Sequence, residues 1–368
     1  MAMQHLDPTD PAAGTVRGDA LSGYLRAQAT EFLRALRLHR ESGGSTAGNA
    51  GGAVDAARAL RRSARRISGS LHTFRPLLDP DWSEEMRPEL AWLSGTLGLE
   101  HAYEARLERL LQALHRLSGA TVFPTQAALT NKAVGRRAGP GVEEAPSSPG
   151  GPARPAAGTE RGNLTVGAAK AGALLERQLT LARTRAHSTA LQAIGSSRFH
   201  AVADKVAVLA SEVPLTPAAA TTDLGPLAAA AKERLTDAVG SLPLVTAGHP
   251  YNAEALIHGL SPDLTPHPQD GPWHQVRLLL RLHRYAREAM HEGDAPADVR
   301  LLTAGQALNQ HRDASEAAAA AAQAARTPRI APATAYALGV LHADQRHEVE
   351  AARFAFQQAW LGQTVGAP

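Results

Sequence analysis

The basic residues of this chain form two rows with the spacing of an α-helix. Each row steps by three, four, three and four residues, so each lies along one face of a helix. The rows consist of Arg58, Arg61, Arg65, Ser68 and His72, and of His274, Arg277, Arg281, Arg284 and Glu288. The first three positions of the rows are separated by a constant 216 residues. Guanidinium groups repeated at helical spacing are suited to bind the successive charges of a polyanion.

Each row runs beside an apolar seam. The first seam is formed by Leu60, Ala64, Ile67, Leu71 and Phe74. In the second copy Val276 and Leu280 occupy the positions that correspond to Leu60 and Ala64. Charges at the edge of a buried seam are partly removed from water and need anionic partners, from the protein or from a ligand.

Pairing within the protein is the alternative interpretation of the arginines. Arg284 and Glu288 stand one helical turn apart, and Asp55 stands three residues before Arg58, so both pairs have the spacing of ion pairs within a helix. From the residues alone, both interpretations stay open.

Composition indicates a folded protein with a mild basic excess. The chain has 368 residues, of which 44% are apolar and 4% aromatic, with a net charge of +3 and no cysteine. Disulfides and thiolate metal sites are therefore excluded. The first 18 residues lack the apolar core of a signal peptide, and no apolar run reaches the roughly 18 residues of a membrane span. We expect a soluble, cytoplasmic protein without membrane contact.

Helical periodicity recurs along the whole chain, and no segment shows the alternation of a strand. Helices are predicted over 21–40, 54–78, about 80–117, 164–194, 199–212, 224–240, 273–291, 299–325 and 332–361. A second pair of motifs repeats with them, since Leu97–Ala102 corresponds to Leu308–Asp313 at an offset of 211 residues. The pattern predicts an all-α fold of two pseudo-symmetric four-helix bundles of long helices.

The predicted organisation has two helical halves with flexible ends. Residues 1–20 are expected to be a flexible tail, 21–212 the first half, 213–362 the second half and 363–368 a C-terminal tail. Residues 124–162 are rich in proline and glycine, which favours a disordered insertion within the first half.

The second row resembles the signature of the CHAD family, the conserved histidine α-helical domain. The pattern H-x-x-R-x-x-x-[K/R]-x-x-R-Y-x-x-E is matched by His274, Arg277, Arg281, Arg284, Tyr285 and Glu288. His311-Arg312-Asp313 is similar to the family's H-x-D element, with Asn309 where glycine is usual. In the first half the match is looser, because Arg58 replaces the histidine and Ser68 an arginine. The resemblance covers roughly residues 21–122 and 163–361.

The resemblance implies a stand-alone CHAD-like domain that binds inorganic polyphosphate in a basic groove between its halves. Both free polymer and polyphosphate granules fit this expectation. The residues predicted to bind polyphosphate are Arg58, Arg61, Arg65, Arg66, His274, Arg277, Arg281, Arg284 and His311. The two histidines are expected to donate to the anion and to gain protons near pH 6.5, with buried core histidines as the alternative.

Sequence motifs give no support to catalysis. The chain has no serine nucleophile elbow, Walker A loop, paired acidic residues for Mg²⁺ or H-E-x-x-H, so no enzyme activity, metal or cofactor is expected. A nucleic acid is the rival polyanion, because basic helices attract any polyanion. Few aromatic residues are present to stack single-stranded bases, so polyphosphate is the favoured partner. A structural or partner-binding helical protein is the third alternative.

Overall fold

The computed structural model describes residues 18–43, 50–119, 157–249, 260, 267–294 and 296–362. Within this part of the chain the regular structure is helical, and the extended backbone pairs only at an isolated bridge between Leu78 and Leu215. The all-α prediction is confirmed. The α-helices are α1 (Gly18–Gly43), α2 (Ala50–Thr73), α3 (Pro80–Ser118), α4 (Ala157–Ile194), α5 (Ser197–Ser211), α6 (Gly225–Gly240), α7 (Leu244–Ala247), α9 (Gly271–Met290), α10 (Val299–Ala325) and α11 (Pro332–Leu361).

Local sequence explains several helix ends. The Asp79 side chain accepts a hydrogen bond from the backbone of Trp82 at 2.8 Å, with Pro80 in the first turn of α3. At the other end of α3, Gly119 adopts the left-handed backbone conformation, with φ at 65°. Asp298 caps α10 through the backbone N–H of Leu301 at 3.1 Å.

Two predicted boundaries differ from the structure. The helix α1 begins at Gly18, so residues 18–20 belong to it and not to the expected tail. Residues 157–162, expected in the disordered insertion, are the first turns of α4. The remaining parts of the expected tails and insertion, 1–17, 124–156 and 363–368, lie outside the described residues.

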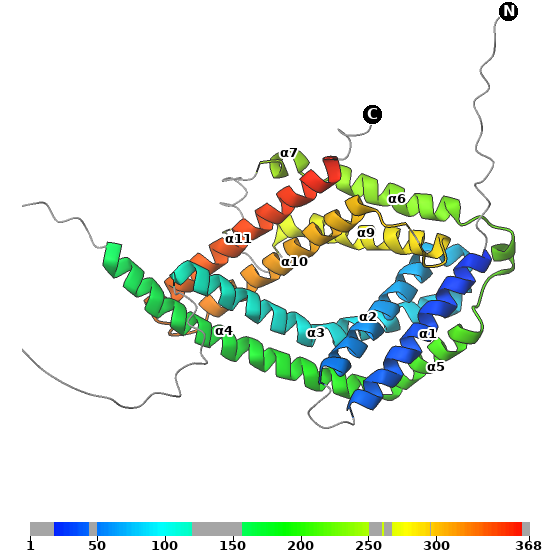
Figure 1. The fold of residues 1–368 in the computed structure, drawn as a ribbon, viewed down its shortest axis with the longest axis horizontal. Coiled ribbons are helices and arrows are strands. Elements are labelled where there is room, and N and C mark those ends of the chain that lie inside the picture. Colours follow the sequence, from blue (N-terminus) through cyan, green and yellow to red (C-terminus); the bar gives the residue numbers. More distant parts are fainter. Residues whose placement is uncertain are drawn as a thin grey trace, which may run out of the picture.

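The helices enclose three apolar cores. The first is built mainly by α1, α2, α5 and the first half of α3, and the second by α6, α9, the start of α10 and the end of α11. In the third, the second half of α3 packs with α4, α10 and α11. Figure 1 shows this arrangement, with the hairpins α3–α4 and α10–α11 meeting at the end of the molecule opposite α1. The predicted bundles are therefore joined by a third one, built from both halves of the chain.

The helices α2 and α9, which carry the two basic rows, pack against each other. Their contact is close at Gly69, where a Cβ atom would lie 2.6 Å from Cδ2 of Tyr285. Glycine is therefore required at position 69 for α9 to approach α2 this closely. The seam predicted for α2 is confirmed, because Leu60, Ala64, Ile67, Leu71 and Phe74 are all fully buried. With the seams turned inward, the two arginine rows meet along one edge.

Candidate functional site

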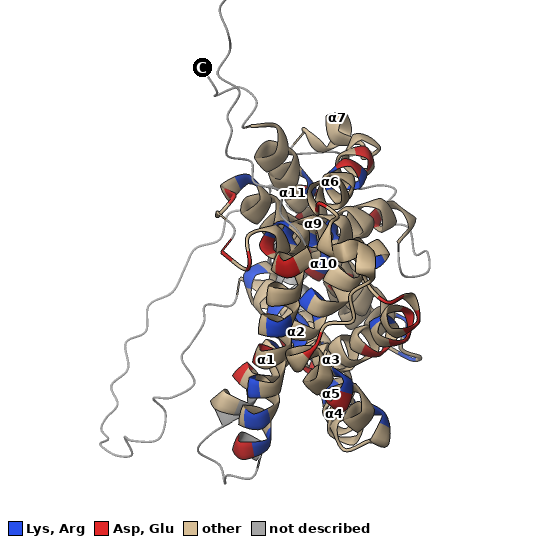
Figure 2. Cartoon of the chain, turned by 90° about the vertical axis from the view of Figure 1, so that its right-hand side faces the viewer, with Lys and Arg blue, Asp and Glu red and all other residues tan. Residues whose placement is uncertain are grey.

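Arginine side chains from three helices converge where α2, α9 and α10 meet. The cluster, called here the arginine cluster, consists of Arg61, Arg65, Arg277, Arg281 and Arg312. All five are half-buried. Figure 2, in which Lys and Arg are blue, shows such residues on α2 at the middle of the molecule, next to α9 and α10. The sequence prediction that Arg61, Arg65, Arg277 and Arg281 lie together is therefore reproduced by the fold.

Burial and the charges of neighbouring arginines lower the pKa values of four members of this cluster. Burial, followed by the charges of Arg61 and Arg281, lowers the pKa of Arg65 to about 10. Burial, then the charges of Arg312 and Arg281, lowers the pKa of Arg277 to about 9. The pKa values of Arg61 and Arg281 are lowered in the same way. All of these groups remain charged at neutral pH, so the cluster holds an uncompensated positive charge.

Few acidic groups of the protein offset this charge. Within the described residues, Arg61, Arg65 and Arg281 form no ion pair, and the Nε atoms of Arg61 and Arg281 are buried without a hydrogen-bond partner. Arg277 Nε donates to the neutral amide oxygen of Asn309 at 2.8 Å. Only Arg312 is paired, with Asp313 and, at 3.8 Å, with Glu316. Guanidinium donors left unpaired in a half-buried site are available to anionic oxygens of a ligand.

Three of the predicted binding arginines lie outside the cluster. Arg58 is exposed and pairs with Asp55 at 3.3 Å, as the alternative interpretation had it. For Arg284 the alternative of pairing with Glu288 is not formed, because Glu288 accepts instead from Arg66 Nε at 2.6 Å. Arg284 lines a separate cavity of about 210 Å³ next to Glu288 and Pro296.

Arg66 is part of a structural connection between α1, α2 and α9. Besides its ion pair with Glu288, its guanidinium lies 5.9 Å from the centre of the Tyr285 ring. The hydroxyl of Tyr24 on α1 donates to the same Glu288 carboxylate at 3.0 Å. With its charge satisfied in this way, Arg66 is a helix-packing residue in the structure and not an open anion donor.

The two predicted histidines have different surroundings. His274 is half-buried at the edge of the site, with Nε2 at 3.4 Å from the hydroxyl of Ser315. His311 is only 1% exposed, and its ring stacks on Trp273 with 5.6 Å between the centres. Burial is the main reason that the pKa of His311 falls to about 4, and it also lowers the pKa of His274. His311 is therefore the buried core histidine of the alternative, and the lowered pKa of His274 argues against the expectation that it gains a proton near pH 6.5.

His311 belongs to a buried ionic network that joins α9, α10 and α11. At its centre Asp270, before α9, accepts from Arg346 at 2.8 Å and from Arg353 at 2.8 Å. Arg353 also donates to Glu350 at 2.7 Å, and its Nε lies 3.3 Å from His311 Nε2. Although burial opposes it, the bonds from His311 and Arg346 hold the pKa of Asp270 well below its usual range. This network fixes the N-terminal end of α9 and thereby the start of its basic row.

The sequence interpretation missed Arg312 as a member of the site. In the sequence, Arg312 stood out only as part of the His311-Arg312-Asp313 motif. A signal was present, since Asn309 and Arg312 are three residues apart on one helix face and both face Arg277. The ionic network carried no comparable signal, because Asp270 lies more than 70 residues before Arg346 in the chain.

The described residues fit neither the role of metal-ion ligands nor that of membrane-spanning helices. No three His, Asp or Glu side chains there come together so that they could hold a metal ion. None of the described helices combines the length and the apolar character that a membrane span needs.

Comparisons with known proteins complete the description of the site. A family profile described as "CHAD domain" matches residues 27–322. Among solved structures, the chain is similar to PptA from Streptomyces chartreusis, with 69% sequence identity over 94% of this chain and 99% of that one, and a TM-score of 0.73. It also aligns with a CHAD domain from the plant Ricinus communis at 15% identity and a TM-score of 0.48, over 100% and 98% of the two chains. No curated protein matches.

Proposed function

The chain belongs to the CHAD domain family, and from this premise we propose that it binds inorganic polyphosphate, or a similar polyanion, without hydrolysing it. The binding site is a basic groove between the two helical halves, lined by the arginine cluster. Polyphosphate is the ligand that the resemblance to this family implies. The arginine cluster carries the proposal, because its shape and charge suit a polymer of phosphates.

The electrostatics of the cluster favour a ligand with several negative charges. Two like charges about 8 Å apart repel each other by roughly 2 kcal/mol at an effective dielectric constant of 20. The fold collects five guanidinium groups and leaves Arg61, Arg65 and Arg281 without a carboxylate partner in the described chain. A single small anion would relieve little of this repulsion, whereas a phosphate chain contacts all three helices at once.

The chemistry of the donors matches phosphate oxygens. Each guanidinium offers planar donors that bond phosphate in pairs, and a backbone of phosphates presents an acceptor at each unit. One exposed contact contributes only about 1 kcal/mol, so affinity arises from several contacts along the polymer. We therefore expect affinity to rise with chain length and to fall steeply with salt.

The test is a titration of the full chain with long-chain polyphosphate and with duplex DNA at equal phosphate concentration, over a range of salt concentrations. We expect polyphosphate to bind at least about tenfold more tightly, with a logarithmic salt slope of about three or more. Phosphate release, followed over the same period, is expected to stay at the level of the protein-free control. Equal affinity for duplex DNA would favour the nucleic-acid alternative, and binding of neither would leave a structural role.

A further inference from the structure

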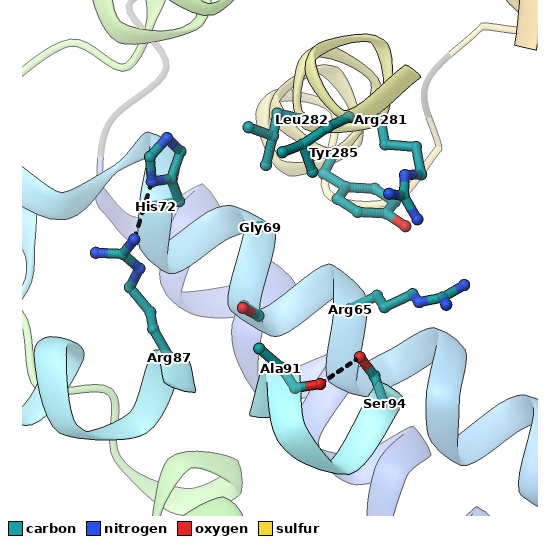
Figure 3. A pocket seen from close by; sticks show the side chains of 11 residues that line it. Arg65, Gly69, His72, Arg87, Ala91, Ser94, Arg281, Leu282 and Tyr285 are labelled. Carbon is teal, nitrogen blue, oxygen red and sulfur yellow. Dashed lines mark hydrogen bonds between the residues drawn. The ribbon is translucent and has the colours of Figure 1, made fainter. Parts of the chain in front are cut away.

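A cavity of about 430 Å³ opens between α2, α3 and α9, next to the arginine cluster (Figure 3). Each helix contributes one face to it, from Arg65 to His72 on α2, from Arg87 to Ser94 on α3 and from Leu278 to Tyr285 on α9. Its volume lies in the usual range for pockets that bind small molecules. Arg65 and Arg281 belong both to this cavity and to the arginine cluster, so a ligand could occupy both.

Along the cavity, the lining changes from charged side chains to an apolar surface. Figure 3 shows Arg65 and Arg281 together on one side, with Gly69, Leu282 and Tyr285 between them and the opposite end. At the rim the Leu278 side chain is 49% exposed. An inorganic phosphate chain gains nothing from such a carbon surface, because its oxygens lose water there without finding donors. The middle of the cavity therefore suits an organic group.

The far end of the cavity is polar, and its arginine is paired with a carboxylate. Arg87 pairs with Glu84 at 3.0 Å and lies 3.2 Å from Nδ1 of His72. Burial, then the charge of Arg87, lowers the pKa of His72, so its ring is neutral at pH 7. The hydroxyl of Ser68 has no hydrogen-bond partner within the described chain. These groups can bond sugar hydroxyls or the edge of a base.

We infer that this cavity binds the organic end of a nucleoside polyphosphate, with the phosphates on Arg65 and Arg281 and the nucleoside against Gly69, Leu282 and Tyr285. The inference rests on the phosphate binding proposed above and adds a different class of ligand to it. Burial of roughly 50 Å² of apolar surface by the nucleoside corresponds to about a tenfold gain in affinity. A nucleoside triphosphate therefore binds more tightly than inorganic triphosphate of equal length.

The test compares ATP with inorganic tripolyphosphate on the full chain by calorimetry, at low salt and with EDTA present. Tripolyphosphate carries at least as much negative charge as ATP, so charge alone predicts no advantage for ATP. We expect ATP to bind about tenfold more tightly. Equal affinities, or tighter binding of tripolyphosphate, would overturn the inference.

A pair of matched variants tests whether the tighter binding of ATP arises in this cavity. Ala91→Leu places a larger side chain in the cavity, whereas Ala105→Leu makes the same change at an exposed position of the same helix outside it. We expect Ala91→Leu to remove the advantage of ATP while tripolyphosphate affinity stays within twofold, and Ala105→Leu to retain both affinities. An advantage that survives Ala91→Leu would contradict the assignment to this cavity.

The two proposals fail in different ways. If long-chain polyphosphate binds and ATP has no advantage over tripolyphosphate, only the nucleoside cavity is refuted. If ATP keeps its advantage, sensitive to Ala91→Leu, while long-chain polyphosphate does not bind, the proposed polymer binding is refuted and the cavity stands.

Discussion

The guanidinium of Arg61 on α2 lies against the backbone of Gly98 on α3, so closely that a Cβ atom at position 98 would fall 2.5 Å from Arg61 Cζ. Glycine at this position thus leaves room for the Arg61 head group. Since Arg61 Nε has no hydrogen-bond partner among the described residues, this packing against α3 is what restrains it. Gly98 acts as a positioning residue for one arginine of the cluster.

The second half of the chain holds the corresponding arginine by a different contact. Arg277, 216 residues after Arg61, donates to Asn309, which stands 211 residues after Gly98. In both halves a residue of the following long helix therefore orients the arginine. The glycine offers space, whereas the asparagine offers an acceptor. Asparagine at position 309, where glycine is usual, therefore supplies a hydrogen-bond acceptor for Arg277.

Replacing Gly98 by alanine is expected to weaken polyphosphate binding by displacing the Arg61 guanidinium. Loss of one arginine–phosphate contact costs about 1 kcal/mol, or about fivefold in affinity. The matched control is Gly95→Ala on the same helix, where an added Cβ meets no atom within 4 Å. Both variants gain about 0.5–1 kcal/mol of helix propensity, so thermal unfolding should not fall in the control. Unchanged polyphosphate affinity in Gly98→Ala would show that Arg61 does not contact the ligand.

Reversing two charges of the cluster is expected to abolish binding. The double substitution Arg277→Glu and Arg281→Glu removes two donors and repels the polymer, so affinity should fall at least about 100-fold. Helicity, measured by circular dichroism, should be retained because the buried Val276 and Leu280 hold α9 in the core.

The control for this double variant is Arg37→Glu with Arg40→Glu, which changes the net charge equally at two exposed positions of α1. We expect its affinity to stay within about threefold of the unaltered chain, the remaining effect being long-range and screened by salt. An equal loss in both variants would mean that net charge, and not the arginine cluster, determines binding.

Arg66 is expected to contribute to stability and not to binding. Arg66→Gln leaves Glu288 with only Tyr24 as a donor, which should lower the free energy of unfolding by about 2 kcal/mol. Arg62→Gln, at an exposed position of the same helix, should change it by less than about 0.5 kcal/mol. Chemical denaturation measures both. A loss of polyphosphate affinity in folded Arg66→Gln, with stability unchanged, would restore Arg66 to the binding site.

The sequence was sufficient for the helices and for the helix faces that carry the two rows. Helical periodicity is a local property, and fifteen of the eighteen predicted starts and ends lie within three residues of those observed, as at Val299–Ala325 and Pro332–Leu361. It was not sufficient for the third core, since the packing of α4 with α10 and α11 depends on alanines such as Ala171, Ala317 and Ala337. Small residues allow close approach without indicating which helix will approach.

For the site, sequence spacing gave the face of each arginine but not its partner across helices. Arg66 and Arg65 are neighbours in the chain, yet only Arg66 meets a carboxylate, because Glu288 comes from α9. The partners of His311 were equally hidden, since Asp270 and Arg353 reach it from other segments. Such contacts depend on how helices are placed, which a periodic pattern does not specify.

Polyphosphate affinity is expected to be nearly constant between about pH 5.5 and 8. The pKa of His311 is lowered to about 4, and burial lowers the pKa of His274 as well, which disfavours proton uptake by either ring near pH 6.5. The arginines keep their charge throughout. Affinity measured at fixed ionic strength with a long polymer, whose end groups contribute little, tests this expectation. A tightening centred near pH 6.5 would show that a histidine is protonated on binding.

Folding stability, unlike binding, is expected to depend on pH through His311. Its pKa is about 4 in the folded chain and about 6.5 when unfolded, so the unfolded chain takes up the proton first as pH falls. The stabilisation is therefore complete above about pH 6.5 and lost as pH falls towards 4. Below that, Asp270, whose pKa is held below its usual range, begins to lose its own contribution. Unfolding free energies measured from pH 7 to 4 should fall by up to about 3 kcal/mol from His311 alone.

Substitution of His311 separates its contribution to the pH dependence of stability from the contributions of other titrating groups. His311→Gln should be less stable than the unaltered chain at pH 7, and its stability should decline less between pH 6.5 and 4, because one titrating group is gone. The buried His283, whose pKa is also lowered, still contributes a slope of the same sign in both proteins. His115→Gln, at an exposed position, should keep the full pH dependence. If His311→Gln and the unaltered chain lose stability in parallel, His311 is not the group that makes the fold sensitive to acid.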